Sequence, residues 1–139
     1  MRKLPLTIFL CCLFVVVSAF RYPSPPLMLT EADSGKTETV YQNTKIIIHL
    51  ASNPSTGYSW RVSTPTNTVL TLLSQRFITP TPQPGHEHNV GVPGTMEFVF
   101  NASASGTEKL LLTYQRSWEK TKPATRYFMV TIRVRARPH

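Results

Sequence analysis

The sequence predicts an all-β sandwich, on three observations. From Lys36 onward the chain divides into short runs rich in β-branched and aromatic residues, separated by turn-forming residues. No segment shows a convincing helical period, and there is no internal repeat. The prolines beyond residue 19 all fall between the runs, as strands require. The sequence therefore predicts seven strands, at residues 37–41, 45–51, 58–63, 69–78, 95–101, 108–115 and 126–135.

Alternation within these runs predicts which side chains form the core. In the last run every second residue is apolar, and the same alternation occurs in two earlier runs. The predicted inward residues are Ile46, Ile48, Leu50, Tyr58, Trp60, Val62, Met96, Phe98, Phe100, Phe128, Val130, Ile132 and Val134. Trp60 could also stack on a ligand, but an indole at core spacing favours burial.

The N-terminus predicts a secretory signal peptide at residues 1–19. Arg2 and Lys3 precede an apolar stretch at residues 4–17, and the small residues before position 20 indicate a cut after Ala19. The apolar stretch is shorter than the roughly 20 residues of a membrane-spanning helix, which favours a removable signal over an anchor. We therefore expect a secreted or endo-lysosomal (vacuolar) protein that has no membrane contact after signal removal.

The mature chain is expected to comprise two parts. Residues 20–35 are rich in proline and lack periodicity, which predicts a flexible or extended arm, and residues 36–139 form the domain. Both cysteines, Cys11 and Cys12, lie in the signal, so the domain must be held by burial without a disulfide. Loss of Arg2 and Lys3 leaves 13 basic and 7 acidic side chains, a net charge of +6 that favours acidic partners.

Strand order predicts a binding edge at one end of the sandwich. If successive strands run antiparallel, the loops at 52–57, 79–94 and 116–125 share one end, and those at 64–68 and 101–107 share the other. In the first of these loops Pro54 fixes its φ angle and Gly57 can adopt a positive φ, which predicts a stiff, exposed turn. Shaped loops on a rigid sandwich are typical of binding proteins.

Three motifs occur in these loops, in the order Asn53-Pro54-Ser55-Thr56-Gly57-Tyr58, Gly91-Val92-Pro93-Gly94 and Arg116-Ser117-Trp118. In this order they resemble the loop motifs of the chagasin-like inhibitors of papain-family cysteine peptidases, across residues 36 to 137. The family pattern has Thr, Gly and Pro where this chain has Ser55, Pro93 and Ser117. Ser55 keeps a β-hydroxyl, whereas the other two changes alter backbone freedom.

The resemblance implies an immunoglobulin-like sandwich of seven to eight strands that inhibits papain-like (cathepsin-type) cysteine peptidases reversibly and tightly, as a monomer and without a cofactor. Thr56 and Gly57 would approach the catalytic groups of the peptidase. Residues 91–94 would lie along one wall of its cleft, while Arg116 and Trp118 would hold the opposite wall.

The residues themselves give little support for an enzyme. His86 and His88 lack a nearby third metal ligand, His49 lies opposite the apolar face of its strand, and the acidic residues are dispersed. Arg133, Arg135 and Arg137 form a period-two stripe, which favours a charged outer face or a guarded edge over polyanion binding. Because no aromatic residues suited to base stacking accompany them, nucleic acid binding is not expected.

An extracellular adhesion or glycan-binding module that uses the same loop edge is the alternative interpretation. The chain also carries an acceptor sequon for N-glycosylation at Asn101-Ala102-Ser103, whereas the proline in Asn53-Pro54-Ser55 excludes that site. A glycan on Asn101 would lie away from the motif loops.

Overall fold

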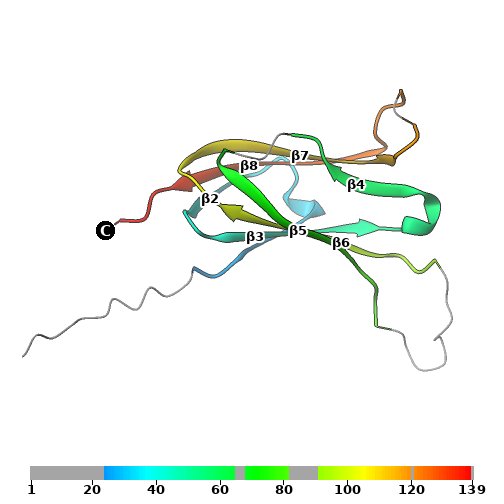
Figure 1. Cartoon of the computed structure of the whole chain (residues 1–139), viewed down its shortest axis with the longest axis horizontal. Helices are drawn as coiled ribbons and strands as arrows, with labels where there is room; N and C mark the ends of the chain where they lie inside the picture. Colours follow the sequence, from blue (N-terminus) through cyan, green and yellow to red (C-terminus); the bar gives the residue numbers. More distant parts are fainter. Residues whose placement is uncertain (1–23, 65–67, 82–90, 120, 139) are drawn as a thin grey trace, which may run out of the picture.

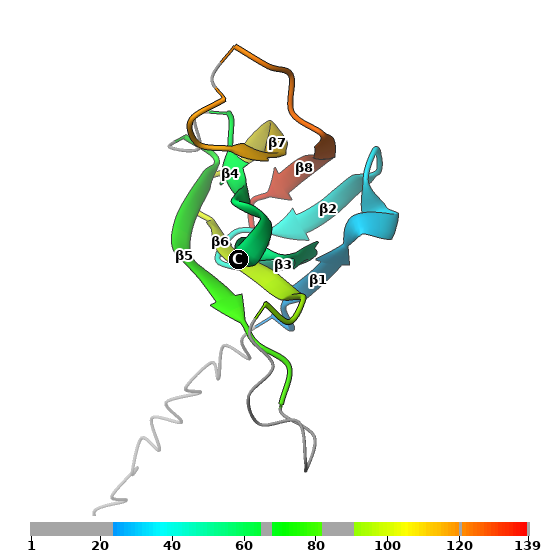
Figure 2. The same cartoon turned by 90° about the vertical axis from the view of Figure 1, so that its right-hand side faces the viewer.

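The computed structural model describes residues 24–64, 68–81, 91–119 and 121–138, and these form two facing four-stranded sheets (Figures 1 and 2). One sheet has the order β1-β3-β6-β5 and the other β2-β8-β7-β4. The strands are β1 (Leu27–Thr30), β2 (Thr37–Tyr41), β3 (Lys45–Ser52), β4 (Tyr58–Val62), β5 (Leu70–Ile78), β6 (Gly94–Ala102), β7 (Gly106–Arg116) and β8 (Arg126–Arg135). Two short 3₁₀ turns, η1 (Glu31–Asp33) and η2 (Pro54–Thr56), lie between strands. In these ranges no helix has the length and apolar character needed to cross a bilayer.

The structure confirms the all-β fold class and the seven predicted strands, with ends that differ by two residues or fewer. Within the flexible or extended arm predicted at residues 20–35, the structure shows strand β1 and turn η1, which form part of the sandwich. Strand β1 pairs in parallel with β3 and buries Leu29 while Met28 faces solvent. An alternation of four residues beside Pro25 and Pro26 is too short to be recognised in the sequence.

The core lies between the two sheets and consists largely of the residues predicted from alternation. Eleven of the thirteen are buried, and the other two, Tyr58 and Val62, are partly buried and pack against the core. Trp60 is only 1% exposed, so its core assignment is confirmed, and its indole N–H donates to the carbonyl oxygen of Ala51 at 3.0 Å. Burial of this apolar surface is the main stabilising contribution to the fold.

The strand register places the three motif loops at one end, as expected. Ser52 at the end of β3 lies opposite Gly94 at the start of β6, and Tyr58 at the start of β4 lies opposite Arg116 at the end of β7. The first loop therefore crosses from one sheet to the other. The second loop joins β5 to β6 within one sheet, and the third joins β7 to β8 within the other. In Figure 1 these connections lie at the right-hand end.

A cluster of charged side chains lies on the outer face of the β3-β6-β5 sheet. Glu97 accepts hydrogen bonds from His49 at 2.8 Å and from Arg76 at 2.7 Å, and its side chain is about nine-tenths buried. These contacts, from His49 first and then Arg76, hold the pKa of the Glu97 carboxyl below its usual value. A carboxyl with a depressed pKa stabilises the fold above its unfolded pKa, and this stabilisation is lost as the pH falls through its folded pKa.

We therefore expect Glu97→Gln to lower the free energy of unfolding at about pH 7 by roughly 1–2 kcal/mol. The variant should also lose less stability than wild type when the pH is lowered from about 5 to about 3. Denaturant unfolding across this pH range measures both effects. Glu38→Gln in β2 is the charge-matched control, and equal pH dependence in wild type and Glu97→Gln would contradict the assignment.

Candidate functional site

The first motif folds into a closed turn held by its own polar groups. The Asn53 side-chain oxygen accepts from the backbone N–H of Ser55 at 3.2 Å and from its hydroxyl at 2.6 Å. The Thr56 hydroxyl donates to the Asn53 carbonyl at 2.7 Å, and the Gly57 N–H donates to the Pro54 carbonyl at 3.0 Å. Pro54 opens the turn, and Gly57 closes it with a φ angle of 78°. These bonds fix the loop in a compact conformation before any partner is present.

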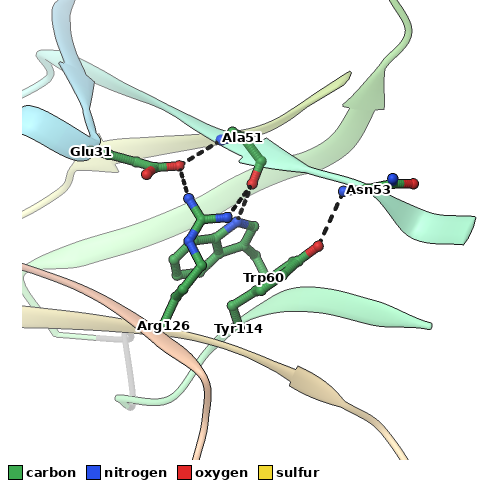
Figure 3. Close-up of polar contacts among 6 residues, drawn as sticks. All are labelled: Glu31, Ala51, Asn53, Trp60, Tyr114 and Arg126. Atoms are coloured by element: carbon green, nitrogen blue, oxygen red, sulfur yellow. Dashed lines mark hydrogen bonds and ion pairs between the residues drawn. The ribbon is translucent and has the colours of Figure 1, made fainter. Parts of the chain in front are cut away.

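The base of this loop is held by aromatic side chains from the opposite sheet (Figure 3). The Asn53 N–H donates to the Tyr114 hydroxyl at 3.1 Å, while Trp60 donates to Ala51. Tyr114 also stacks on Tyr58, with ring centroids 5.4 Å apart, and lies 5.1 Å from Trp60. The start of the loop is thus fixed relative to both sheets.

The third loop packs directly on the first. The Trp118 ring lies over Gly57 so closely that a Cβ atom on Gly57 would be 2.3 Å from its Cη2 atom, yet the side chain is 66% exposed. Arg116 donates from Nε to the Thr56 carbonyl at 3.3 Å, and its guanidinium lies 4.6 Å from the centre of the Tyr58 ring. Trp118 therefore combines a fixed base with a large free surface, which is a feature of binding anchors.

Glu119 stabilises the third loop through two ion pairs. Its carboxylate lies 2.9 Å from Lys122 Nζ and 3.5 Å from a terminal nitrogen of Arg116. The hydrogen bond from Lys122 and the neighbouring positive charges hold the pKa of Glu119 below its usual value. The ion pair with Glu119 further restrains Arg116.

The described part of the second loop lies on the other side of the first. Gly91, with a φ angle of 83°, approaches Ser55, since an added Cβ would lie 3.2 Å from the Ser55 hydroxyl oxygen. Between the two loops is a hollow of about 210 Å³ whose lining includes Pro54, Phe77 and Val92. The central loop therefore has Trp118 on one flank and a mainly apolar hollow on the other.

Gly94, Tyr58 and Arg116 differ from the other motif residues because each belongs to a strand. Gly94 begins β6, and a Cβ there would lie 2.5 Å from the carbonyl oxygen of Ile78, so this close approach requires glycine. Tyr58 begins β4 and is partly buried under Arg116. Pro93 and Ser117 are both exposed. The structure thus brings all three motifs together, but Gly94 and Tyr58 support the edge from within.

Sequence reasoning missed three contributors to this end of the molecule, namely Glu31, Tyr114 and Arg126, which surround the base of the first loop (Figure 3). Tyr114 has the spacing of a core residue, and no local pattern distinguishes Glu31 or Arg126.

The predicted signal peptide, His86, His88 and His139 lie outside the described residues. Within the described ranges no three His, Cys, Asp or Glu side chains are grouped to hold a metal ion.

Asn101 lies at the opposite end from the motif loops. It is paired with Lys45 and Thr71 near the end of β6, and its Nδ2 atom donates to the Ser103 hydroxyl at 3.2 Å. The side chain is partly exposed on the outer face of its sheet. Glycosylation of Asn101 remains a prediction, and a glycan at this position would leave the loop edge accessible.

A sandwich whose first loop packs against the other two loops at one end has the architecture of a binding protein. The chain belongs to the chagasin family of peptidase inhibitors (I42), whose family model matches residues 39–132. This confirms the resemblance found in the motifs.

Individual relatives support the same assignment. The chain is 36% identical over 108 residues to amoebiasin-2 from Entamoeba histolytica, covering 78% of this chain and 85% of that protein. It is 32% identical over 95 residues to chagasin from Trypanosoma cruzi, covering 65% and 81%. The crystal structure of a cysteine protease inhibitor from Entamoeba histolytica matches with a TM-score of 0.69 at 32% identity, covering 80% of this chain and 96% of that one. The family consists of inhibitors and not of enzymes.

The contact between Gly57 and Trp118 predicts a non-additive pair of substitutions. Gly57→Ala should cost about 1–2 kcal/mol in backbone strain and should also displace the Trp118 ring. In the Trp118→Ala background only the backbone strain remains, so Gly57→Ala should destabilise less there. Unfolding free energies of the four proteins measure the coupling, and strict additivity would contradict the observed packing.

Proposed function

We propose that this protein is a reversible, tight-binding inhibitor of papain-like cysteine peptidases. The observation that carries the proposal is the continuous edge formed by the three family motifs, in which Trp118 lies on Gly57 and Gly91 lies against Ser55. The relatives named above include a cysteine protease inhibitor, which supports the target class. The three loops inhibit by occluding the active-site cleft of the peptidase, which requires neither a catalytic residue nor a cofactor of the inhibitor.

The geometry of the first loop accounts for inhibition without cleavage. Thr56 and Gly57 form the part of the loop that enters the cleft toward the catalytic thiol. The Asn53 and Pro54 carbonyls are already bonded within the turn, so the segment does not present an extended backbone to the peptidase. A substrate must align its scissile bond with the catalytic groups, and this closed turn resists that alignment. Because the loop is ordered beforehand, little conformational entropy is lost on binding.

The two flanks of the first loop contact opposite walls of the cleft. Trp118 and Arg116 hold one wall, with the exposed indole as the main anchor. Gly91, Val92, Pro93 and Gly94 lie along the other, where the hollow beside Phe77 can accept an apolar side chain of the peptidase. The second loop comes from one sheet and the third loop from the other, so the distance between the sheets sets the distance between these two loops.

The compartment belongs to the same proposal. The N-terminal signal pattern supports entry into the secretory pathway and residence in a secreted or endo-lysosomal (vacuolar) lumen. Detection of the mature N-terminus at residue 20 in protein recovered from the native cell would test this.

Titration of papain tests the function directly. Mature protein should abolish activity at a stoichiometry near one to one, and activity should return when the complex is diluted and incubated. The inhibitor recovered from the complex should be intact by mass spectrometry. Unchanged activity of papain and of several cathepsin-type peptidases at large excess of the protein would overturn the proposal and favour the adhesion or glycan-binding module.

Trp118→Ala should weaken inhibition by about 2–4 kcal/mol, which corresponds to a rise of roughly 30- to 1000-fold in the inhibition constant, with little change in melting temperature. Its side chain is largely exposed, so truncation removes binding surface but little core. Tyr41→Ala is the matched control, because Tyr41 is also an exposed aromatic residue but lies at the far end of β2. A lower melting temperature with unchanged inhibition would show that Trp118 has only a structural role.

A further inference from the structure

The end of β3 is held by side chains where a neighbouring strand would otherwise be. Strand β1 pairs with β3 only as far as Thr30 beside His49. Two residues later, the Ala51 N–H donates to the Glu31 carboxylate at 2.9 Å. The Ala51 carbonyl accepts from the Trp60 indole at 3.0 Å and from Arg126 Nη1 at 3.2 Å. Side chains thus supply both partners of the Ala51 backbone just before the first loop begins.

Glu31 and Arg126 also contact each other and thereby join the two sheets (Figure 3). Arg126 is the first residue of β8, in the sheet opposite β3, and its Nη2 atom forms an ion pair with Glu31. The guanidinium lies 5.2 Å from the ring centres of both Trp60 and Tyr114. Arg126 therefore contacts both aromatic residues that bond to Ala51 and Asn53. A planar guanidinium can make these hydrogen bonds and stack on the rings at the same time.

The position of Glu31 is fixed by the segment that carries it. The Asp33 carboxylate accepts from the Thr30 N–H at 2.8 Å and from its hydroxyl at 3.1 Å, which closes the η1 turn. Further along, the Gly35 N–H donates to the Met129 carbonyl at 2.6 Å, and the Met129 N–H donates to the Ser34 hydroxyl at 3.1 Å. The segment is thus anchored to β3 on one side through β1 and to β8 on the other.

We propose that Glu31 and Arg126 are a positioning pair for inhibition, which holds the first loop at the angle needed to enter the peptidase cleft. Glu31 precedes the family-matching region at residues 39–132. The segment N-terminal to that region therefore contributes to inhibition by positioning the first loop. The inference rests on the proposed function. Neither residue touches the peptidase, because both act through Ala51 and Asn53.

The test compares Glu31→Ala, Glu31→Gln and Glu38→Ala in the mature protein. Glu31→Ala should raise the inhibition constant for papain about tenfold, mainly through faster dissociation, because the loop base is then free to shift. Glu31→Gln should recover part of this loss, since its amide oxygen can still accept from Ala51 and Arg126. Glu38→Ala removes the same charge from the neighbouring strand β2 and should leave inhibition within about twofold of wild type.

Double variants separate positioning from general stability. If Glu31 acts through the first loop, Glu31→Ala should be non-additive with Thr56→Ala in that loop and nearly additive with Tyr41→Ala at the far end of β2. Amide hydrogen exchange in the free protein should become faster at Ser55, Thr56 and Gly57, while exchange in the core strands stays unchanged.

The outcomes are distinct. Unchanged inhibition and unchanged loop exchange in folded Glu31→Ala would overturn the proposal, and so would an equal increase of exchange in the loop and the core. If the wild-type protein inhibits no papain-like peptidase, the proposed function fails. Hydrogen exchange then decides alone whether the pair orders the loop.

Discussion

The inhibitory edge depends on the fixed distance between the two sheets at the end of β3. The first loop leaves β3 in one sheet and enters β4 in the other, so any change in sheet spacing would move it. Trp60, Tyr114 and Arg126 reach across from the second sheet and bond to backbone atoms of Ala51 and Asn53. The bonds made by Trp60 and Tyr114 satisfy polar groups in partly buried surroundings, where an unpaired donor or acceptor would be costly. The packing between the sheets therefore sets the geometry of the loop. It does so without a disulfide, because both cysteines lie in the predicted signal.

Two of the three departures from the family motifs, Ser55 and Ser117, lie where tertiary contacts hold the loops. Ser55 uses its hydroxyl to cap the turn on Asn53 and lies against Gly91, and neither contact needs the methyl group of a threonine. Ser117 replaces a proline that would restrict the backbone, but the adjacent Trp118 is positioned by its contact with Gly57. Arg116 adds a hydrogen bond to Thr56 and an ion pair with Glu119. Tertiary contacts thus supply part of the order that proline would give through the backbone alone.

Local patterns predicted most of this structure because most of it is periodic. Alternation identified the strands and the core, and the parity of the connections placed the motif loops at one end. The sequence did not predict β1, since its register depends on β3 and its own alternation spans four residues. It also did not predict the contact between Glu31 and Arg126, which are 95 residues apart and carry no local signal. Pairings of this kind depend on the assembled topology, so only the folded chain reveals them.

The contacts between the loops imply that the edge behaves as one unit. Gly57 supports Trp118, Thr56 accepts from Arg116, and Ser55 lies against Gly91, so each motif touches another in the free protein. A substitution in one loop therefore changes the order of its neighbours as well as its own contact with a peptidase. Single-alanine effects across such an edge do not sum to the binding free energy. The same coupling explains how a small sandwich can present three separate segments of chain as one rigid surface, because the entropy of ordering them is lost during folding and not during binding.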